Sequence, residues 1–302
     1  MLIKKIEIMV YQECKNKKKA KKNTGAKEQC LEGLTIKTAV HVLGFKFDSI
    51  EDAKDKTKWN AAVAEKQIIP LYEVEELASA NTEDTVFEGR RNQYITSTGK
   101  KVTTYNSFLS LCSHSALKTY HKADLGLFEF TEDGAIKGVI NEDGTVKGQA
   151  IVMNVGKRID PTSDRPASTQ VTLNYKDYNE FEDDGAIFRP EGWGADDIFG
   201  IFDVTLKQVS ATTSEIKFTA TDGCSGGDEE ITSFVGLNFL LRDTAGAVVT
   251  HSFVPAAPDG IYTLTGTGFT DGFTLTLKGV VTQTGTGTSY ESPTPLIIKV
   301  TP

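Results

Sequence analysis

Residues 128–157, FEFTEDGAIKGVINEDGTVKGQAIVMNVGK, contain two short reversals of the chain, marked by Asp133-Gly134 and Asp143-Gly144. Asp-Gly pairs supply the positive-φ positions that tight turns between strands need. The residues on either side, such as Phe128 and Phe130 around Glu129, alternate with the two-residue period of a β-strand. This stretch therefore predicts antiparallel strands joined by hairpins.

The same acidic, glycine-flanked residues admit a second interpretation, a site for a metal ion or a phosphate. A calcium loop needs acidic residues at alternate positions and a bidentate glutamate at its twelfth position. EDGAIKGVINEDG, residues 132–144, does not have that pattern. We therefore favour the hairpins, and we predict no metal site and no cofactor.

The composition is that of a globular chain with an uneven distribution of charge. Its 302 residues suffice for two domains with separate cores, and 39% of them are hydrophobic. Residues 1–50 carry a formal charge of +6 and the rest carry −14. An acidic body repels nucleic-acid phosphates, which disfavours specific DNA binding. Without a long apolar run or the apolar core of a signal peptide, the sequence predicts no membrane span and no standard signal peptide.

A lysine-rich segment, KNKKKAKKNTGAK at residues 15–27, lies near the N-terminus. Such runs are usually solvated loops, and the alternative is an arm that lies against an acidic neighbour or a phosphate backbone. No aromatic residue separates the lysines, which weakens the case for nucleic-acid binding by stacking. We predict a basic loop over residues 12–28 that contacts another subunit. The predicted contact residues are Lys17, Lys18, Lys19, Lys21 and Lys22.

The chain has four cysteines, Cys14, Cys30, Cys112 and Cys224, and none forms a CxxC pair or a cluster with zinc-ligand spacing. We interpret them as reduced thiols of a chain made in a cytoplasm. The alternative is a Cys14–Cys30 disulfide that closes the basic loop.

The first domain, predicted over residues 1–198, combines strands with two short helices. Residues 33–45 alternate as a strand, and the side chains expected on one face are Leu34, Ile36, Thr38, Val40 and Val42. We predict helices near 49–66, capped by Ser49, and near 110–120, capped by Ser110 and with Leu111, Leu117 and Tyr120 as its apolar contacts. Residues 171–175 read as a strand with Val171, Leu173 and Tyr175 on one face, and residues 176–185 read as a helical turn or short helix that ends at Gly185. Residues 86–111 read as a long hairpin that reverses at residues 97–99.

The second domain is predicted over residues 199–302, after a glycine-rich joint at residues 188–200. From residue 201 the sequence is rich in Thr, Gly, Val and Ser, and it contains seven short apolar runs with turn signals every 8–15 residues. This spacing predicts an immunoglobulin-like β-sandwich. The fold class is therefore mainly β with a few short helices, an α+β chain with an antiparallel β domain followed by the immunoglobulin-like β-sandwich.

No residue pattern in the chain indicates catalysis. The four histidines, His41, His114, His121 and His251, lack metal-ligand spacing, and no HExxH motif is present. The glycine-rich residues 265–272 lie between two strands and read as a turn rather than a phosphate loop. We interpret the paired carboxylates as residues of solvated turns. The alternative is a pair of glycosidase carboxylates that the fold brings together from distant strands. We predict that the protein is not an enzyme and has no catalytic residues.

Residues 81–121 and residues 125–149, followed by the predicted immunoglobulin-like domain, resemble the structural tail or neck proteins of tailed bacteriophages that infect Bacteroides-type hosts. Within this class, the pattern resembles the tube and ring proteins of crAss-like phages. The resemblance covers roughly residues 30–200 at the level of pattern and includes no short diagnostic motif.

This resemblance implies a tube- or ring-type antiparallel β-sandwich that pairs with neighbouring copies and closes into a ring. It implies a virion protein of the tail or neck, assembled in the host cytoplasm, with neighbouring tail, neck or portal proteins as partners. DNA or cargo would pass through the ring without specific binding, and no membrane would be involved. The alternative is a capsid decoration protein or a glycan-binding adhesin, with Trp193, Tyr262 and Tyr290 as candidate sugar-stacking residues.

Overall fold

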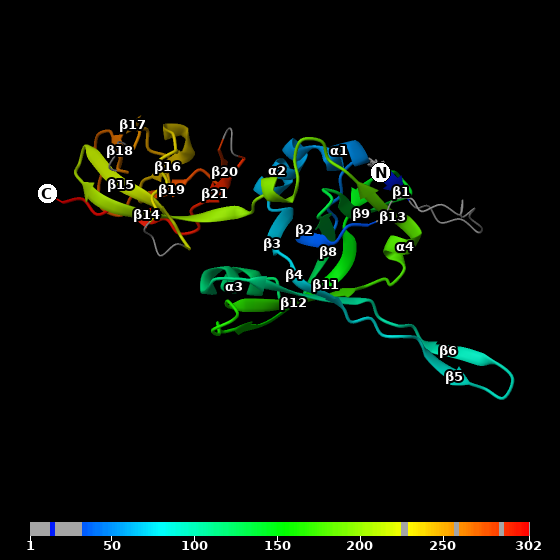
Figure 1. The fold of residues 1–302 in the computed structure, drawn as a ribbon. Coiled ribbons are helices and arrows are strands. Elements are labelled where there is room, and N and C mark those ends of the chain that lie inside the picture. The colour runs from blue at the N-terminus through cyan, green and yellow to red at the C-terminus, as the bar shows by residue number, and fades with distance from the viewer. Residues whose placement is uncertain (1–12, 16–31, 225–228, 257–259, 284–286, 302) are drawn as a thin grey trace, which may run out of the picture. The chain divides into compact units, whose positions relative to one another are not determined.

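In the computed structural model the chain is mainly β with a few short helices, which confirms the predicted fold class (Figure 1). The structure describes residues 13–15, 32–224, 229–256, 260–283 and 287–301. Contacts divide the chain into two compact units, residues 1–62 with 66–198 (unit 1) and residues 63–65 with 199–302 (unit 2). No helix within the described ranges is both long and apolar enough to cross a membrane.

Unit 1 is built on one large sheet with β8 (Ala123–Thr131) at its centre. The first half of β8 pairs with β11 (Gln149–Ile159), and its end pairs with β9 (Ile136–Ile140). β2 (Thr35–Val42) lies along the opposite edge of β8. The other strands are β1 (Glu13–Lys15), β3 (Ile68–Glu73), β4 (Glu75–Ser79), β7 (Val102–Phe108), β10 (Val146–Lys147), β12 (Ser168–Tyr175) and β13 (Gly185–Phe188). The strand order is β1-β13-β9-β8-β11-β12-β7-β4, with β2 and β3 joined to β8 and β10 joined to β9.

The two predicted Asp-Gly reversals are confirmed. Gly134 has φ +78° and Gly144 has φ +87°, in the region that favours glycine. The Asp133 carboxylate accepts a hydrogen bond from the Thr131 hydroxyl, and the Asp143 carboxylate accepts one from the Thr145 amide. Each carboxylate thus closes its own turn and stabilises the hairpin locally.

β2 is buried on both faces, which corrects the prediction of one apolar face. Ala39 and His41 are buried alongside Thr38 and Val40, whereas Val42 is exposed. The reason is that β2 lies between β3 and β8 inside the sheet, and side chains cover both faces of these strands. Leu34, which precedes the strand and was expected on its buried face, is also exposed.

One core of unit 1 is aromatic and lies on the even-numbered face of β8. Trp59 packs against Phe47, Phe128, Phe130 and Trp193, with ring centroids 5.1–5.9 Å apart. The opposite, odd-numbered face of β8 meets an aliphatic core. Its members include Val40, Leu71, Leu125, Leu127, Ile151, Met153, Val171 and Leu173.

The first predicted helix is two helices, α1 (Ile50–Lys54) and α2 (Lys56–Ala64). Ser49 caps α1 by accepting from the Asp52 amide, as predicted. The chain is extended at Asp55, whose carboxylate accepts from the Thr57 amide and so begins the second helix. An Asx interaction of this kind competes with helix continuation, which explains the break.

The later short helices lie close to their predicted positions. α3 (Leu111–Lys118) begins after Ser110, which accepts from the Ser113 amide. Leu117 is buried as predicted, but Leu111 is 68% exposed. α4 (Glu180–Asp184) ends at Gly185.

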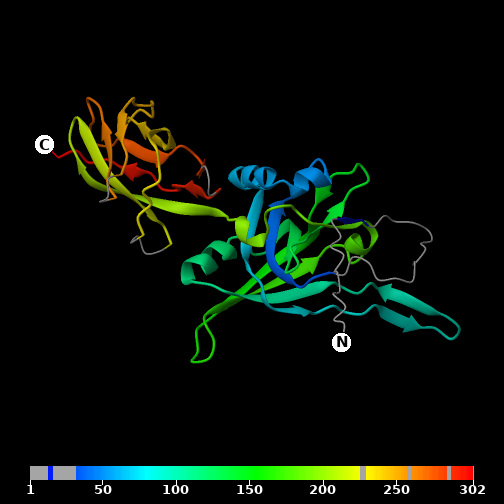
Figure 2. The same ribbon diagram turned by 45° about the horizontal axis from the view of Figure 1, so that its top comes forward.

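β4 and β7 extend into a two-stranded ribbon that projects from the rest of unit 1 (Figures 1 and 2). We call residues 80–101 the arm; its strands are β5 (Thr85–Glu88) and β6 (Gln93–Ser97). The chain reverses at residues 89–92, where the Gly89 amide donates to the Asn92 carbonyl. The predicted reversal at residues 97–99 is wrong, because the Gly99 amide pairs across the ribbon with the Asp84 carboxylate.

Unit 2 contains two main sheets around one apolar core. Phe218, Phe239 and Tyr262 pack together in that core, with centroids 5.0–5.5 Å apart. The larger sheet has the order β17 (Ser252–Val254), β18 (Tyr262–Thr265), β15 (Glu215–Asp222), β14 (Ile201–Ala211), β21 (Ser289–Glu291), β20 (Val281–Thr282). The smaller sheet has the order β16 (Phe239–Arg242), β19 (Thr274–Leu277), β22 (Leu296–Ile297). This arrangement is sandwich-like, and the immunoglobulin-like topology stays a prediction.

The three described cysteines are not the expected reduced thiols. Cys14, Cys112 and Cys224 are disulfide-bonded, and the described residues include no free cysteine. Spacing along the sequence could not reveal this, because pairing depends on how close the folded chain brings the Cα atoms. Cys30 and the five predicted contact lysines lie outside the residues that the structure describes.

Candidate functional site

Glu129 ends a row of apolar side chains on β8. It shares the odd-numbered face with Leu125 and Leu127, both buried, and its own side chain is only 13% exposed. A buried carboxylate is stable only when it is paired and hydrogen-bonded. The position therefore demands partners from neighbouring strands.

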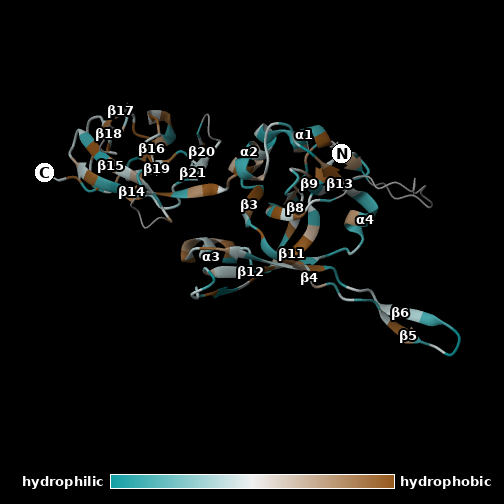
Figure 3. Cartoon of the chain, in the orientation of Figure 1, coloured by the Kyte–Doolittle hydropathy of each residue, from teal (hydrophilic) through white to brown (hydrophobic). Residues whose placement is uncertain are grey.

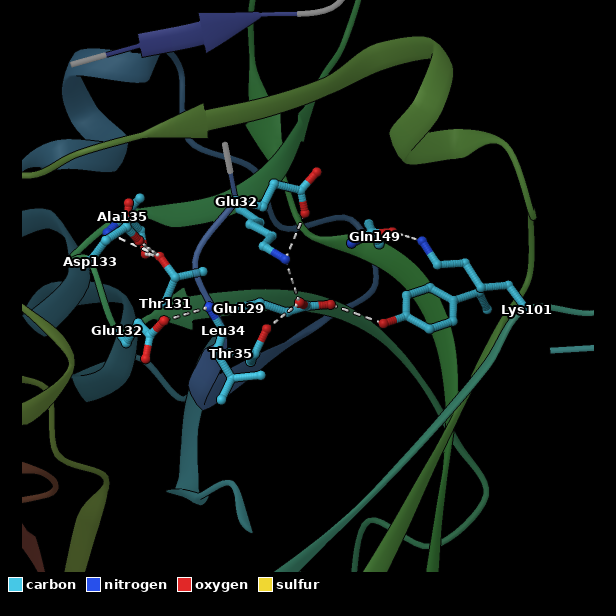
Figure 4. A network of polar contacts seen from close by, with 12 residues as sticks. Glu32, Leu34, Thr35, Lys101, Glu129, Thr131, Glu132, Asp133, Ala135 and Gln149 are labelled. Carbon is cyan, nitrogen blue, oxygen red and sulfur yellow. Dashed lines mark hydrogen bonds and ion pairs between the residues drawn. The ribbon is translucent and has the colours of Figure 1, made fainter. Parts of the chain in front are cut away.

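Three strands and the chain before β2 supply those partners, as Figure 4 shows for the labelled residues. The Thr35 hydroxyl donates to Glu129 Oε2 at 2.8 Å, and the Tyr175 hydroxyl donates to Glu129 Oε1 at 2.9 Å. Lys137 lies opposite Glu129 in the β8–β9 register, with its Nζ 3.5 Å from Glu129 Oε2. The same Nζ is 2.8 Å from Glu32 Oε2. The result is one connected network across β2, β8, β9 and β12.

Burial and charge in this network keep its amine and phenol protonated. Burial, followed by the negative charge of Glu129, raises the pKa of Tyr175 far above its usual range. Burial alone would lower the pKa of Lys137, but attraction to Glu129 and Glu32 outweighs it and raises the pKa. Neither group is therefore suited to accept a proton near neutral pH.

A pocket of about 290 Å³ opens beside this network, at the base of the arm. Lys101 lines it, with Nζ 4.5 Å from the centroid of the Tyr175 ring and 5.7 Å from that of Phe181. Lys101 Nζ donates to Gln149 Oε1 at 3.3 Å. Burial lowers the pKa of Lys101. The pocket thus has a polar side at Glu129 and an amine set against two aromatic rings.

Two carboxylates, Glu32 and Glu129, meet in this pocket, which the sequence did not reveal. Glycoside hydrolysis uses such a pair, one as acid and the other as base or nucleophile. Here both carboxylates bind the single ammonium of Lys137, and Glu129 also accepts from two hydroxyls. The arrangement therefore holds neighbouring strands together, and each carboxylate already pairs with donors of the protein.

The aromatic candidates for sugar stacking are packing residues. Tyr262 is fully buried, and its hydroxyl donates to the Ile231 carbonyl at 2.7 Å. The Trp193 indole donates to the Lys54 carbonyl at 2.6 Å and packs on Trp59. Tyr290 packs in unit 2 on Phe202 and Phe234. These contacts correct the expectation of a stacking platform at Tyr262 and Trp193.

His41 is a buried structural residue. Its Nε2 accepts from the Gly148 amide at 2.8 Å, so the ring proton lies on Nδ1 and points to the Val42 carbonyl at 2.9 Å. The close approach requires glycine on β8, since a Cβ at Gly126 would lie 1.9 Å from His41 Nε2. Among the described residues, no group of three or more His, Cys, Asp or Glu side chains is placed to hold a metal ion.

A scan against protein-family models finds no match for this chain, and a comparison with curated proteins finds none either.

Proposed function

We propose that this protein is a non-enzymatic virion structural protein that assembles with copies of itself into a ring of a phage tail or neck. The ring would form part of a conduit for DNA or other cargo. The observation that carries the proposal is the arm, whose large apolar side chains lie in water in the single chain.

All residues of β5 and β6 are exposed. Val86 lies opposite Ile95 on one face of the ribbon, and Phe87 lies opposite Tyr94 on the other. Phe87 is 61% exposed and Ile95 is 65% exposed. Figure 3 shows hydrophobic residues within β5. An isolated two-stranded ribbon is marginally stable in water, so apolar side chains on both its faces favour a partner that covers them.

Association through the arm fits better than association through the outer strand of the sheet. β4 ends the strand order of the sheet, but its pairing with β7 contains a register shift between Glu75 and Ala78. Glu76 within that shift has φ +50°. Bulges and charges are features that discourage strand addition at an edge. The arm is therefore the surface that we assign to subunit contact.

The distribution of charge and the disulfide bonds agree with this role. Residues 51–302 carry a formal charge of −14, which suits a channel wall along which DNA slides without sticking. Disulfide bonds at Cys14, Cys112 and Cys224 suit a protein of an extracellular particle, since such bonds persist outside the reducing cytoplasm.

The test is the oligomeric state of the full-length protein, measured by light scattering after size exclusion and by negative-stain imaging. Two double variants separate the faces of the arm, Phe87→Ser with Tyr94→Ser and Val86→Ser with Ile95→Ser. Each lost side chain should weaken association by about 1.5–3 kcal/mol if its face is buried in the assembly. Leu43→Ser, which removes an exposed leucine of unit 1 outside the arm, is the matched control.

The expected result is a ring for the wild type and for the control, and smaller species for at least one arm variant. A wild-type protein that stays monomeric at all concentrations would overturn the proposal. Rings formed equally well by both arm variants would overturn the role of the arm.

One observation favours a second candidate, a glycoside hydrolase, because Glu32 and Glu129 line the same pocket. Hydrolysis of aryl glycosides by wild-type protein, abolished by Glu32→Gln, would establish it. Equal background rates for the wild type and the variant would dismiss it.

A further inference from the structure

The pocket at the base of the arm has two unlike walls. The polar wall holds Glu129 and Lys137, while Leu77, Leu173 and Phe181 form an apolar wall. Ligand pockets typically combine an apolar lining with a few placed polar groups. A volume of about 290 Å³ is at the lower end of ligand sites, so an occupant would be small.

Lys101 and Lys137 differ in the acceptors that lie near their ammonium groups. Lys137 Nζ has Glu32 at 2.8 Å and Glu129 at 3.5 Å. Lys101 Nζ has one hydrogen bond, to the neutral amide of Gln149 at 3.3 Å, and no described carboxylate lies within 4.0 Å of it. Two of its three N–H donors thus have no acceptor among the described residues, although the side chain is half-buried. Desolvation of an ammonium is unfavourable until an acceptor, preferably an anion, meets it.

We propose that this pocket binds a small organic monocarboxylate, whose carboxylate pairs with the Lys101 ammonium and whose carbon skeleton lies against Leu77, Leu173 and Phe181. One negative charge matches Lys101, the pocket-lining lysine without a carboxylate within 4.0 Å among the described residues, whereas Lys137 is already paired. A second negative charge would be repelled by Glu129 and Glu32, which line the same space. The inference does not depend on the proposed assembly, since all the named residues belong to unit 1.

The site also has a structural consequence for the arm. Ser79 and Lys101 both line the pocket. Ser79 is the last residue of β4 before the arm, and Lys101 is the last residue of the arm before β7. A bound carboxylate that holds Lys101 should slow backbone hydrogen exchange at the base of the arm.

The experiment uses the full-length protein and three probes of one shape: benzoate, the neutral benzamide and the cationic benzylamine. Binding is followed by calorimetric titration, and protection is followed by hydrogen exchange. Benzoate should bind, and the other two should not. Lys101→Met should weaken benzoate binding about tenfold to a hundredfold, as expected for a lost charge-assisted hydrogen bond. Lys100→Met, at the exposed neighbouring lysine, should bind as the wild type does.

Three outcomes would overturn the proposal. If benzoate does not bind the wild-type protein, the proposed carboxylate site does not exist, and this conclusion requires no variant. Benzamide that binds as tightly as benzoate removes the role of charge. Equal binding of benzoate by a folded Lys101→Met protein leaves only an adventitious contact elsewhere.

Discussion

At the scale of single residues, Glu129 shows how one buried charge constrains its surroundings. The side chain lies at the end of a leucine row, and donors come from Thr35, Lys137 and Tyr175 on three other strands. Removing one partner of such a network leaves the others buried without compensation. The network therefore favours the observed register of β8 against β2 and β9, and it connects β8 to β12 by a side-chain hydrogen bond.

We expect Glu129→Leu to lower the free energy of unfolding by about 1–3 kcal/mol, because Tyr175 and Lys137 lose their acceptor. Adding Lys137→Met should recover part of the loss by removing the amine. Urea unfolding measures both effects. Glu142→Gln, at an exposed turn, is the control and should change stability by less than about 0.5 kcal/mol. If the double variant loses as much unfolding free energy as the two single variants lose together, the residues are not coupled within one network.

His41 predicts a dependence of stability on pH. Burial lowers its pKa below the ordinary value near 6.5, with Lys147 acting in the same direction and the Val42 carbonyl and Glu180 opposing it. The unfolded chain therefore binds the proton more readily than the folded chain. The contribution of neutral His41 to the free energy of unfolding is therefore present in full above about pH 6.5, and it is lost as the pH falls towards the folded pKa.

The measurement is the urea midpoint of the wild type and of His41→Gln between about pH 4 and pH 8, around the ordinary histidine pKa. The variant should lose less stability on acidification. Parallel pH profiles for the two proteins would mean that other groups cause the loss.

At the scale of elements, the arm and the sheet of unit 1 differ in what stabilises them. The strands of the sheet are held by buried side chains on both faces, as in β2 and β8. The arm has only its own backbone pairing and the side chains of its partner strand. It should therefore contribute little to the stability of the single chain, whatever it contributes to assembly.

We expect deletion of residues 85–97, joined by a short glycine linker, to change the stability of the monomeric chain by less than about 0.5 kcal/mol. The physical reason is that none of these residues is buried. Leu173→Ala, in the aliphatic core, should by contrast cost about 2–5 kcal/mol. Thermal unfolding at low protein concentration checks both, and a large loss on deletion would show that the arm supports the sheet.

At the scale of the whole molecule, opposite charges are separated along the chain, with +6 in residues 1–50 and −14 in the remainder. We propose that the lysine-rich segment of one subunit meets the acidic surface of another. Exposed charges of this kind attract strongly at low ionic strength and weakly at high ionic strength.

Replacing Lys17, Lys18, Lys19, Lys21 and Lys22 by glutamine should therefore weaken assembly more at low salt than at high salt. Unlike a deletion of residues 12–28, this change leaves β1 and its pairing with β13 in place. Light scattering across a salt series measures the difference. Equal assembly by the variant and the wild type at every salt concentration would refute a role for these charges.

Local features were the most predictable from the sequence. The Asp-Gly turns at residues 133–134 and 143–144, the caps at Ser49 and Ser110, and the end of α4 at Gly185 all depend on residues a few positions apart. The buried face of β12 at Val171 and Leu173 was predictable for the same reason. Glu129 was missed, although a signal existed: it lies in a strand that is apolar on both faces.

The sequence by itself determined that this chain is mainly β, because turn residues, capping residues and two-residue alternation act over short distances. Only the tertiary structure decided that Glu129 is largely covered, where the arm reverses, and that Cys14, Cys112 and Cys224 are disulfide-bonded. The physical reason is that these features depend on residues far apart in the sequence, as when Thr35 and Tyr175 meet Glu129. Their energies depend on packing and on distance in space, which no short stretch of sequence specifies.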